Sequence, residues 1–583
     1  MSAESTPPTA DQVTAGELVC RILREREVNT VFCLSGAAHT YLLADMEKQG
    51  FRVVSTRTET STVGAADGYA RAKGGIGVAM IVGKQGLPNA LGGIRTAQLA
   101  CSPVIVLASV YEAASREAMD EEPNDQLAMV RPYAKWARIV PSADRMEEFV
   151  NAAIHRATTG RPGVAVIGIP TRYAAAKVDD NTTYTSAKAP PAPPEPDLAS
   201  IATAVELIAG AKRPLILAGT GAALAGAGPE LRRLAAMGVP VFGHATGRGL
   251  VPEDMESGFP WPLAQVAAKH ADVVISLGIR LTQRIGFGMA PRFSAKARFV
   301  QVDIDPSEIG RNRKIDVPIV ADAKRAGAAL ASALEGRNFK APSSAWIGDA
   351  IAARVARLDE LGHEETGPIH PLRIGRELMR LMPPETIFVA DGADIYNWMS
   401  GVVRIRSDRG YMDHYPLGSM GIGTALALGA TAASQEIATR SGGVPRPVVL
   451  VTGDGSFGYY TAELNSATLA GLAFTCVISN DGAWGTEKNG HLAHWDHSIN
   501  CELGQCDYHL IGQAYGCIGE KIEAIGDLAP ALERALAADR TTVLNVLTDP
   551  DAGLVRKKDP RLQMVTFEDL PSSLDAHHQI DLA

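Results

Sequence analysis

The sequence has 583 residues, several times the size of a single domain, so we expect several domains with separate hydrophobic cores. Hydrophobic residues make up 46% of it and charged residues 21%, which excludes a largely disordered chain. Lys and Arg number 56 against 65 Asp and Glu, and the chain has no long basic run. A nucleic-acid partner is therefore not expected.

The seven cysteines are odd in number, scattered, and form no CxxC pair, so we expect reduced thiols. Apolar stretches such as 78–83 and 103–110 are far shorter than the roughly 20 residues of a membrane helix. The first residues, MSAESTPPTADQ, lack the basic and apolar regions of a signal peptide. We therefore expect a cytoplasmic location and no membrane partner.

Short apolar runs alternate with segments of helical period, which is typical of parallel strands joined by crossover helices. Thr14 to Glu17 has the pattern of a capping box and predicts a helix that begins there. In chain order, the first part then predicts strands over 29–34, 52–56, 77–82 and 103–109 and helices over 60–72 and 87–100.

The same alternation continues through the rest of the chain. A middle part predicts strands over 214–219, 240–245, 273–278 and 298–305. A last part predicts strands over 386–392, 447–455 and 474–482, a glycine-rich helix after Ser419 and a helix over 461–470. The expected fold class is α/β, with three doubly wound parallel-sheet domains.

Composition shifts predict the domain boundaries. A proline-rich linker covers 186–197 and a charged, proline-flanked linker covers 343–368. The predicted divisions are an N-terminal domain at 1–185, a central domain at 198–342, a C-terminal domain at 369–550, and a tail at 551–583 that could act as a lid over an active site.

The richest segment for chemistry follows two neighbouring strands of the last part. One strand ends in Gly453-Asp454-Gly455, and the next ends in Asn480-Asp481-Gly482. Because the carboxyl ends of parallel strands meet at one edge of a sheet, Asp454 and Asp481 can converge on one point. Glycines allow a phosphate to approach the backbone, and carboxylates with phosphate oxygens suit Mg²⁺. The sequence therefore predicts a diphosphate bound through Mg²⁺.

This segment resembles the signature of thiamine diphosphate enzymes, which usually ends in Asn-Asn, whereas Asp481 stands second here. A second resemblance lies in Arg57-Thr58-Glu59 and the following GAADGYARAKG. The resemblance implies that the three domains are a pyrimidine-binding domain, a central Rossmann-like domain and a diphosphate-binding domain. It also implies that Glu59 is catalytic and hydrogen-bonds the aminopyrimidine ring of the cofactor.

The resemblance implies further site residues. Met420, within Leu417-Gly-Ser-Met-Gly421, matches an apolar residue that wedges beneath the cofactor, although simple packing is the alternative. Lys84 and Gln85 depart from the family pattern. Either they face the substrate, or they are a local variant of the loop. The implied cofactor contacts are Gly453, Asp454, Gly455, Ser456, Asp481, Met420 and Asn89. The implied metal ligands are Asp454, Asp481 and the backbone carbonyl of Ala483.

Glu487 is the second predicted catalytic acid. It lies six residues past Asp481, where several family members resemble this sequence in placing an acid. Burial beside an anionic substrate would raise its pKa and make it a usable proton donor near neutral pH. The alternative is a solvent-facing Glu paired with Lys488.

The remaining candidates concern nucleotides. Gly219-Thr220-Gly221 is a weak phosphate-binding signal, and the resemblance implies a central domain that holds FAD, ADP or nothing. Arg280 and Asp303 are candidate contacts for ADP or coenzyme A. Arg556 and Lys557 in the tail are candidate contacts for the phosphates of coenzyme A. Structural or solvent-facing roles remain open for all of these residues.

The resemblance implies an enzyme that works with thiamine diphosphate and Mg²⁺ and self-associates as a homodimer or homotetramer. Residues 484–488, residues 542–550 and the tail resemble most the branch of 2-hydroxyacyl-CoA lyases and oxalyl-CoA decarboxylases. The expected activity is that of a 2-hydroxyacyl-CoA lyase, which splits a 2-hydroxyacyl-CoA reversibly into formyl-CoA and an aldehyde or ketone. The alternative is an acetolactate synthase type of 2-oxo acid decarboxylase and carboligase, which would favour FAD. A second alternative is a non-catalytic nucleotide-binding paralogue.

Overall fold

The computed structural model describes residues 12–111, 125–180, 191–363 and 365–562. The chain divides into two compact units, which are described separately. The first unit contains the chain up to residue 191 together with 416–419 and 428–443. The second unit contains 192–415, 420–427 and the chain from 444 onward.

The first unit is built on a six-stranded parallel sheet with the order β3-β2-β4-β5-β7-β6. The strands are β2 (Thr30–Cys33), β3 (Arg52–Ser55), β4 (Gly77–Val82), β5 (Val104–Val110), β6 (Trp136–Ile139) and β7 (Val164–Pro170). The helices are α1 (Ala15–Glu25), α2 (Thr40–Lys48), α3 (Glu59–Lys73), α4 (Gly86–Leu99), α5 (Met146–Thr158) and α6 (Thr171–Ala175). A short β1 (Gln12–Thr14) pairs antiparallel with β8 (Lys177–Asp179).

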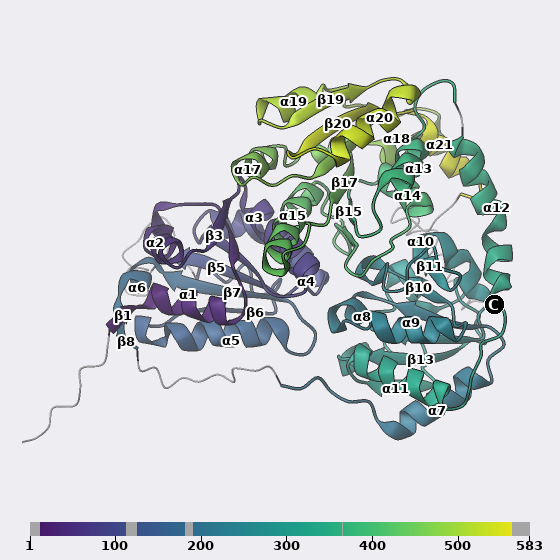
Figure 1. Ribbon diagram of the computed structural model, residues 1–583, viewed down its shortest axis with the longest axis horizontal. Coiled ribbons are helices and arrows are strands. Elements are labelled where there is room, and N and C mark those ends of the chain that lie inside the picture. The colour runs from purple at the N-terminus through teal and green to yellow at the C-terminus, as the bar shows by residue number, and fades with distance from the viewer. Residues whose placement is uncertain (1–11, 112–124, 181–190, 364, 563–583) are drawn as a thin grey trace, which may run out of the picture. The chain divides into compact units, whose positions relative to one another are not determined.

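Helices cover both faces of this sheet. Side chains of α1, α2 and α5 share one hydrophobic core with the strands, and Figure 1 shows α1 and α5 lying side by side. α3 and α4 pack against each other and against the strands. Thr58 caps α3, because its hydroxyl accepts a hydrogen bond from the Ser61 backbone N–H at 3.2 Å. This cap places Glu59 in the first turn of a buried helix.

The central part of the second unit has a sheet with the order β11-β10-β9-β12-β13-β14, all parallel. The strands are β9 (Pro214–Ala218), β10 (Val241–Gly243), β11 (Gly258–Pro260), β12 (Val273–Leu277), β13 (Arg298–Asp303) and β14 (Val317–Val320). The helices are α7 (Leu198–Ala209), α8 (Thr220–Ala225), α9 (Gly228–Ala236), α10 (Trp261–Ala264), α11 (Ala323–Glu335) and α12 (Ala345–Gly362). α7, α9 and α11 form a core on one face, and α10 and α12 belong to the core on the other (Figure 1).

The last part of the second unit has a third parallel sheet with the order β16-β15-β17-β18-β20-β19. The strands are β15 (Ile387–Ala390), β16 (Tyr411–Asp413), β17 (Val448–Gly453), β18 (Thr475–Asn480), β19 (Ile518–Ile522) and β20 (Thr542–Leu547). The helices are α13 (Pro371–Leu381), α14 (Asp394–Val402), α15 (Ile422–Ser441), α16 (Asp454–Phe457), α17 (Glu463–Leu469), α18 (Gly485–Trp495), α19 (Tyr508–Ala514), α20 (Ile525–Leu536) and α21 (Ala552–Lys558).

The three sheets confirm the predicted fold class. The first and third sheets share one topology. In both, the strand that comes first in the chain lies between the second and the third strands. The central sheet instead follows the order 3-2-1-4-5-6 of dinucleotide-binding folds. In each doubly wound sheet, ligands bind at the carboxyl edge where the strand order reverses. In the third sheet this point lies between β15 and β17.

Most predicted elements are present. Two regions that were predicted as a linker and a tail contain helices. The predicted capping box is confirmed, because the Thr14 hydroxyl accepts a hydrogen bond from the Glu17 backbone N–H at 3.1 Å. The predicted linker at 343–368 contains α12, and the predicted tail contains α21. Part of the proline-rich linker (186–190) and the tail beyond residue 562 lie outside the described residues. Among the helices that the structure describes, none is long and apolar enough to span a membrane.

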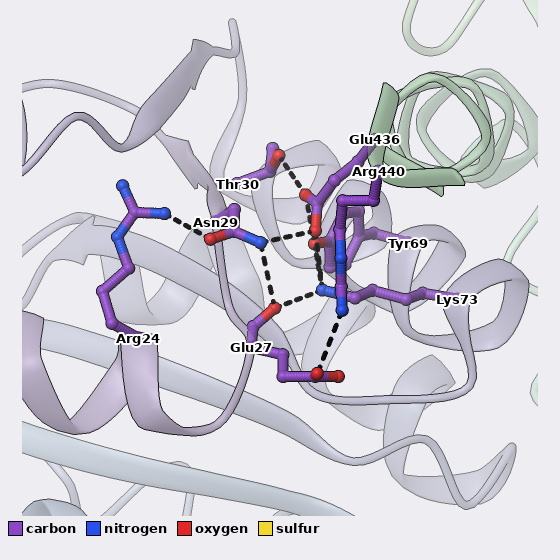
Figure 2. Close-up of polar contacts among 8 residues, drawn as sticks. All are labelled: Arg24, Glu27, Asn29, Thr30, Tyr69, Lys73, Glu436 and Arg440. Atoms are coloured by element: carbon purple, nitrogen blue, oxygen red, sulfur yellow. Dashed lines mark hydrogen bonds and ion pairs between the residues drawn. The ribbon is translucent and has the colours of Figure 1, made fainter. Parts of the chain in front are cut away.

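The C-terminal half of α15 is fixed to the first unit by a buried acid. The Glu436 carboxylate accepts hydrogen bonds from Asn29, Thr30, Tyr69 and Lys73, at 2.6 to 2.9 Å (Figure 2). The side chains of Glu436 and Lys73 are only 10% and 9% exposed. Burial alone would raise the pKa of Glu436, but the hydrogen bonds from its neighbours, led by Lys73, lower it below its ordinary value. The carboxylate therefore stabilises this packing in its charged form.

We predict that Glu436→Gln lowers the free energy of unfolding of the first unit by about 3 kcal/mol, because it leaves the Lys73 ammonium buried without its counter-charge. Thermal unfolding checks this. Arg440→Ala is the matched control, because it breaks the neighbouring but exposed ion pair with Glu27 (Figure 2) and should cost less than about 1 kcal/mol. The cost of Glu436→Gln should shrink as the pH falls below 4.5, the ordinary pKa of this carboxyl. Equal effects of the two variants would contradict this account.

Candidate active site

A pocket opens at the carboxyl edge of the third sheet, at the point where its strand order reverses. Its empty space is about 420 Å³, including the part open to solvent. Loops after β15, β17 and β18 supply most of its walls, and the start of α18, the first residue of α13 and Met420 before α15 supply the rest. The lining residues are Pro371, Gly392, Ala393, Asp394, Ile395, Met420, Gly453, Asp454, Gly455, Ser456, Ser479, Asp481, Ala483, Trp484, Gly485, Thr486 and Glu487.

The pocket brings together most of the residues that the sequence singled out. Met420, the turn at 453–456, Asp481, Ala483 and Glu487 all line it. Glu487 is exposed at the pocket and not buried, which differs from the environment that we expected for it. Lys488 lies with its Nζ 3.4 Å from a carboxylate oxygen of Glu502.

The sequence reading missed the contribution of β15. Gly392, Ala393 and Asp394 line the pocket directly after that strand. A signal was present, because Asp391-Gly392 follows a buried apolar strand just as Asp454-Gly455 does. Strand ends of this kind gather at one edge of a parallel sheet.

Asp391 holds the two turns of the pocket next to each other. Its buried carboxylate accepts hydrogen bonds from the backbone N–H groups of Gly392 at 2.6 Å, Gly421 at 3.2 Å and Gly423 at 2.9 Å. Two of these donors, Gly421 and Gly423, belong to the turn that directly follows Met420. The backbone that follows Met420 is therefore fixed beside the pocket by contacts within the second unit.

The loop after β18 is fixed by amides and by a glycine. Asn480 donates a hydrogen bond to the Asn545 side-chain oxygen at 3.0 Å and accepts one from the Gly482 backbone N–H at 3.2 Å. Gly482 has a φ of +68°, a conformation that favours glycine. A Cβ at Gly455 would lie 2.5 Å from the ring of Trp484, so only glycine fits at this turn. These constraints explain why the predicted motif contains glycine at these positions.

The two carboxyl groups in the pocket disturb each other's protonation. Burial raises the pKa of Asp454 to about 6. Burial, together with the negative charges of Asp454 and Asp394, raises the pKa of Asp481 to about 9. One oxygen of Asp454, Oδ2, is buried and has no hydrogen-bond partner among the described residues. A positive charge at this point would relieve both effects.

These features fit a divalent cation that is held partly by a ligand. Nowhere in the described ranges do three His, Cys, Asp or Glu side chains gather to hold a metal by themselves. Mg²⁺ commonly takes one or two carboxylates and completes its shell with water and phosphate oxygens. The glycine turn at 453–455 and the start of α18 offer backbone N–H groups to such a phosphate.

Glu59 lies in the first unit, at the start of α3. It is 7% exposed, and its Oε2 accepts a hydrogen bond from the Asn89 side chain at 3.3 Å. A Cβ at Gly86 would lie 3.3 Å from both Cγ and Oε1 of Glu59, so the turn before α4 passes close to this acid. Lys84 and Gln85 belong to the same turn, and Gln85 is exposed. Lys84 and Gln85, which depart from the family pattern, therefore lie in the turn that leads to the contact of Gly86 with Glu59.

The central candidates share the carboxyl edge of their sheet. Gly219 follows β9, Arg280 follows β12, and Asp303 ends β13. The two glycine loops touch, since the Gly221 N–H donates to the Gly278 carbonyl at 2.8 Å and a Cβ at Gly221 would lie 2.9 Å from the Gly278 Cα. The glycines at this point thus have a packing role, which accounts for the weak phosphate-binding signal.

Arg556 and Lys557 lie on α21. The Arg556 guanidinium is buried and donates a hydrogen bond to Asp394 Oδ1 at 3.1 Å. It therefore points to the pocket wall and not to solvent, where a lid over coenzyme A would need it. Lys557 is partly exposed.

Comparison with known proteins assigns the chain to a family. The thiamine pyrophosphate enzyme family matches in three parts: its N-terminal TPP binding domain over residues 13–129, its central domain over 201–330 and its C-terminal TPP binding domain over 391–546. The chain belongs to the thiamine pyrophosphate enzymes, as the sequence predicted. The boundaries between its domains stay a prediction.

The relatives fall into two groups by name, acetolactate synthases and 2-hydroxyacyl-CoA lyases. A probable acetolactate synthase from Mycobacterium bovis is 30% identical over 564 residues, which cover 96% of this chain and 99% of the relative. A 2-hydroxyacyl-CoA lyase 2 from Caenorhabditis elegans is 27% identical, over 91% of this chain and 89% of the relative. A 2-hydroxyacyl-CoA lyase from Arabidopsis thaliana is also 27% identical, over 94% and 98%. The chain is therefore a thiamine pyrophosphate-dependent enzyme, and its relatives act in two reaction classes.

The coupled carboxyl groups predict a pH effect on the metal-free protein. Both pKa values are raised above the ordinary 3.8, so the folded state retains protons that the unfolded state releases. Stability that is present below pH 3.8 is lost as the pH rises through about 6 and then about 9. We expect Asp481→Asn to reduce the fall of the melting temperature between pH 5 and about 9.

Differential scanning calorimetry without divalent cations checks this. Asp539→Asn, which removes an exposed carboxylate from the same part of the chain, is the matched control and should keep the wild-type slope. Addition of Mg²⁺ and thiamine diphosphate should flatten the slope of the wild type. A slope for Asp481→Asn equal to that of the wild type would show that the carboxyl groups do not interact.

Proposed function

We propose that this protein is a 2-hydroxyacyl-CoA lyase that splits a 2-hydroxyacyl-CoA into formyl-CoA and an aldehyde or ketone, and can run the reverse carboligation. The observation that carries the proposal is that an acid, Glu487, lines the same pocket as the glycine turn and the paired Asp454 and Asp481. Relatives named as 2-hydroxyacyl-CoA lyases, matched over nearly their whole length, support the choice of reaction.

The pocket residues have complementary roles in this proposal. The backbone of Gly453, Asp454, Gly455 and Ser456 would hold the cofactor's diphosphate, with Gly392 and Ala393 beside this turn. Asp454, Asp481 and the carbonyl of Ala483 would hold Mg²⁺, and Met420 would support the cofactor by an apolar contact. The orphaned Oδ2 of Asp454 supports the metal role. When bound, thiamine diphosphate supplies a nucleophilic carbon that stores an electron pair while the substrate is cleaved.

Two acids of the chain handle protons. Glu59, held by Asn89, hydrogen-bonds the cofactor's aminopyrimidine ring. Glu487 takes the proton of the substrate's 2-hydroxyl while the bond between C1 and C2 breaks, so that C2 leaves as the carbonyl carbon of the aldehyde or ketone. The same proton is then returned to C1, which leaves as formyl-CoA. Atoms balance, because one proton moves from oxygen to carbon and nothing is oxidised.

The wider setting is proposed from the same basis. The central domain binds ADP or part of coenzyme A, with Arg280 and Asp303 at the carboxyl edge of its sheet as contacts. Lys557 remains a candidate for the phosphates of coenzyme A. The protein self-associates as a homodimer or homotetramer and acts in the cytoplasm on a small-molecule substrate.

An acetolactate synthase type of reaction is the second candidate. The acetolactate synthase relative from Mycobacterium bovis is 30% identical to this chain, against 27% for the two lyase relatives. The same Glu59 and the same metal pocket would serve the joining of two 2-oxo acids, with FAD in the central domain. Glu487 would then donate a proton to the acceptor's carbonyl oxygen.

The assay that separates these functions uses the purified protein with thiamine diphosphate and Mg²⁺. A 2-hydroxyacyl-CoA should give formyl-CoA and an aldehyde, detected by mass spectrometry, while pyruvate should give no acetolactate. Glu59→Gln should fold and bind the cofactor but lose about 10²- to 10⁴-fold in turnover. Acetolactate without thioester cleavage would move the protein to the synthase class. Turnover of neither substrate would favour a non-catalytic paralogue. Unchanged turnover in Glu59→Gln would instead contradict the catalytic role of Glu59.

Glu487→Gln tests the second acid. The variant keeps the size of the side chain but cannot carry the proton, so kcat should fall about 10²- to 10⁴-fold while the dissociation constant of the cofactor changes little. Glu533→Gln on α20, another exposed helix Glu, is the control and should keep wild-type kcat. Loss of cofactor binding in Glu487→Gln would give this residue a structural role instead.

A further inference from the structure

The pocket contains a third aspartate beside Asp454 and Asp481, and Arg556 of helix α21 is its ion-pair partner among the described residues. Asp394 lies on the wall formed by β15, where its Oδ1 accepts from Arg556 at 3.1 Å and its Oδ2 accepts from the Trp398 indole N–H at 2.9 Å. The side chains of Arg556 and Asp394 are only 4% and 12% exposed. This ion pair is therefore screened little by solvent.

Asp394 lies close to the carboxyl groups that the proposed metal would bind. A Cβ at Gly485, the first residue of α18, would lie 2.2 Å from Asp481 Oδ2 and 3.4 Å from the Asp394 Cβ. The two acids thus lie on either side of one glycine. A divalent cation balances the charges of Asp454 and Asp481 and leaves the charge of Asp394 for another group.

Helix α21 is built tightly into this wall. It packs against α18, and a Cβ at Gly553 would lie 2.3 Å from the Asn489 side chain and 2.7 Å from Asp394 Oδ1. Beyond its C-terminal end, Asp559 accepts a hydrogen bond from Arg357 at 3.1 Å. Before the N-terminal end of the helix, the Asp549 backbone N–H donates a hydrogen bond to the Ile369 carbonyl oxygen at 2.9 Å. Arg556 is therefore held at the pocket from both ends of the helix.

Polar atoms in the same wall still lack partners. Arg556 Nε, Thr486 Oγ1 and Asn489 Oδ1 are buried and have no hydrogen-bond partner in the part of the chain that the structure describes. Thr486 lines the pocket and is 1% exposed. Unsatisfied buried polar groups are rare in folded proteins and point to a ligand or water that completes them.

We propose that Arg556 is a positioning residue for the diphosphate: through its ion pair, helix α21 neutralises Asp394, so that an anionic diphosphate can bind in the pocket. The proposal rests on the cofactor site proposed above. It gives the C-terminal segment a role in cofactor binding within its own chain, which differs from the lid over coenzyme A expected from the sequence.

The test measures the dissociation constant of thiamine diphosphate at saturating Mg²⁺ by titration calorimetry. Arg556→Met keeps the buried stem but removes the charge, and it should weaken binding about 10- to 100-fold, because Asp394 then repels the diphosphate. Arg556→Lys should bind within about threefold of the wild type. Lys558→Ala, which removes an exposed cation from the same helix, should bind as the wild type does.

The double variant Arg556→Met with Asp394→Asn separates charge from packing. It should return the dissociation constant to within about threefold of the wild type, because both members of the pair are then neutral. A double variant that binds as weakly as Arg556→Met would overturn the proposal and leave Arg556 a packing role, as would wild-type affinity in Arg556→Met. An absence of binding by the wild type itself would contradict the cofactor site, and the proposal with it.

Discussion

The concentration of negative charge at one edge of the third sheet is the constraint on which the site depends. Asp454 is buried, Asp481 beside it is partly buried, and Asp394 stands next to Asp481. Carboxylates in such surroundings are costly unless cations compensate them. Arg556 pairs with Asp394, and in the function that we propose a divalent metal with a phosphate ligand would balance the charge of Asp454 and Asp481.

The fold supports this site through its topology. The strand order of the third sheet reverses between β15 and β17, so the loops that follow these strands diverge and leave a crevice. Asp391 then fixes the first of these loops to the turn that follows Met420. In the first unit, the sheet has the same strand order, and α3 begins with Glu59. The two parts that match TPP binding domains of the family therefore share one sheet topology.

The sequence was sufficient for the features that depend on local pattern. Alternating strands and helices, the glycine turn at 453–455 and the capping residues of α1 all follow from neighbouring residues, and the structure contains them. The sequence did not reveal the Glu436 cluster, because Glu436 and Lys73 are 363 positions apart. Nor did it reveal the role of Arg556, since α21 has only seven residues and its periodicity is too short to detect. Tertiary contacts, and not propensity, determine both.

From these charges we expect the acidic pocket to bind an anionic cofactor only when they are compensated. The most direct measurement is the dissociation constant of thiamine diphosphate for the wild-type protein, determined by titration calorimetry with millimolar Mg²⁺ and again with excess chelator. The account predicts measurable binding with Mg²⁺ and a loss of at least about 100-fold with the chelator, since two uncompensated carboxylates then face the diphosphate. Equal affinity under the two conditions would contradict it.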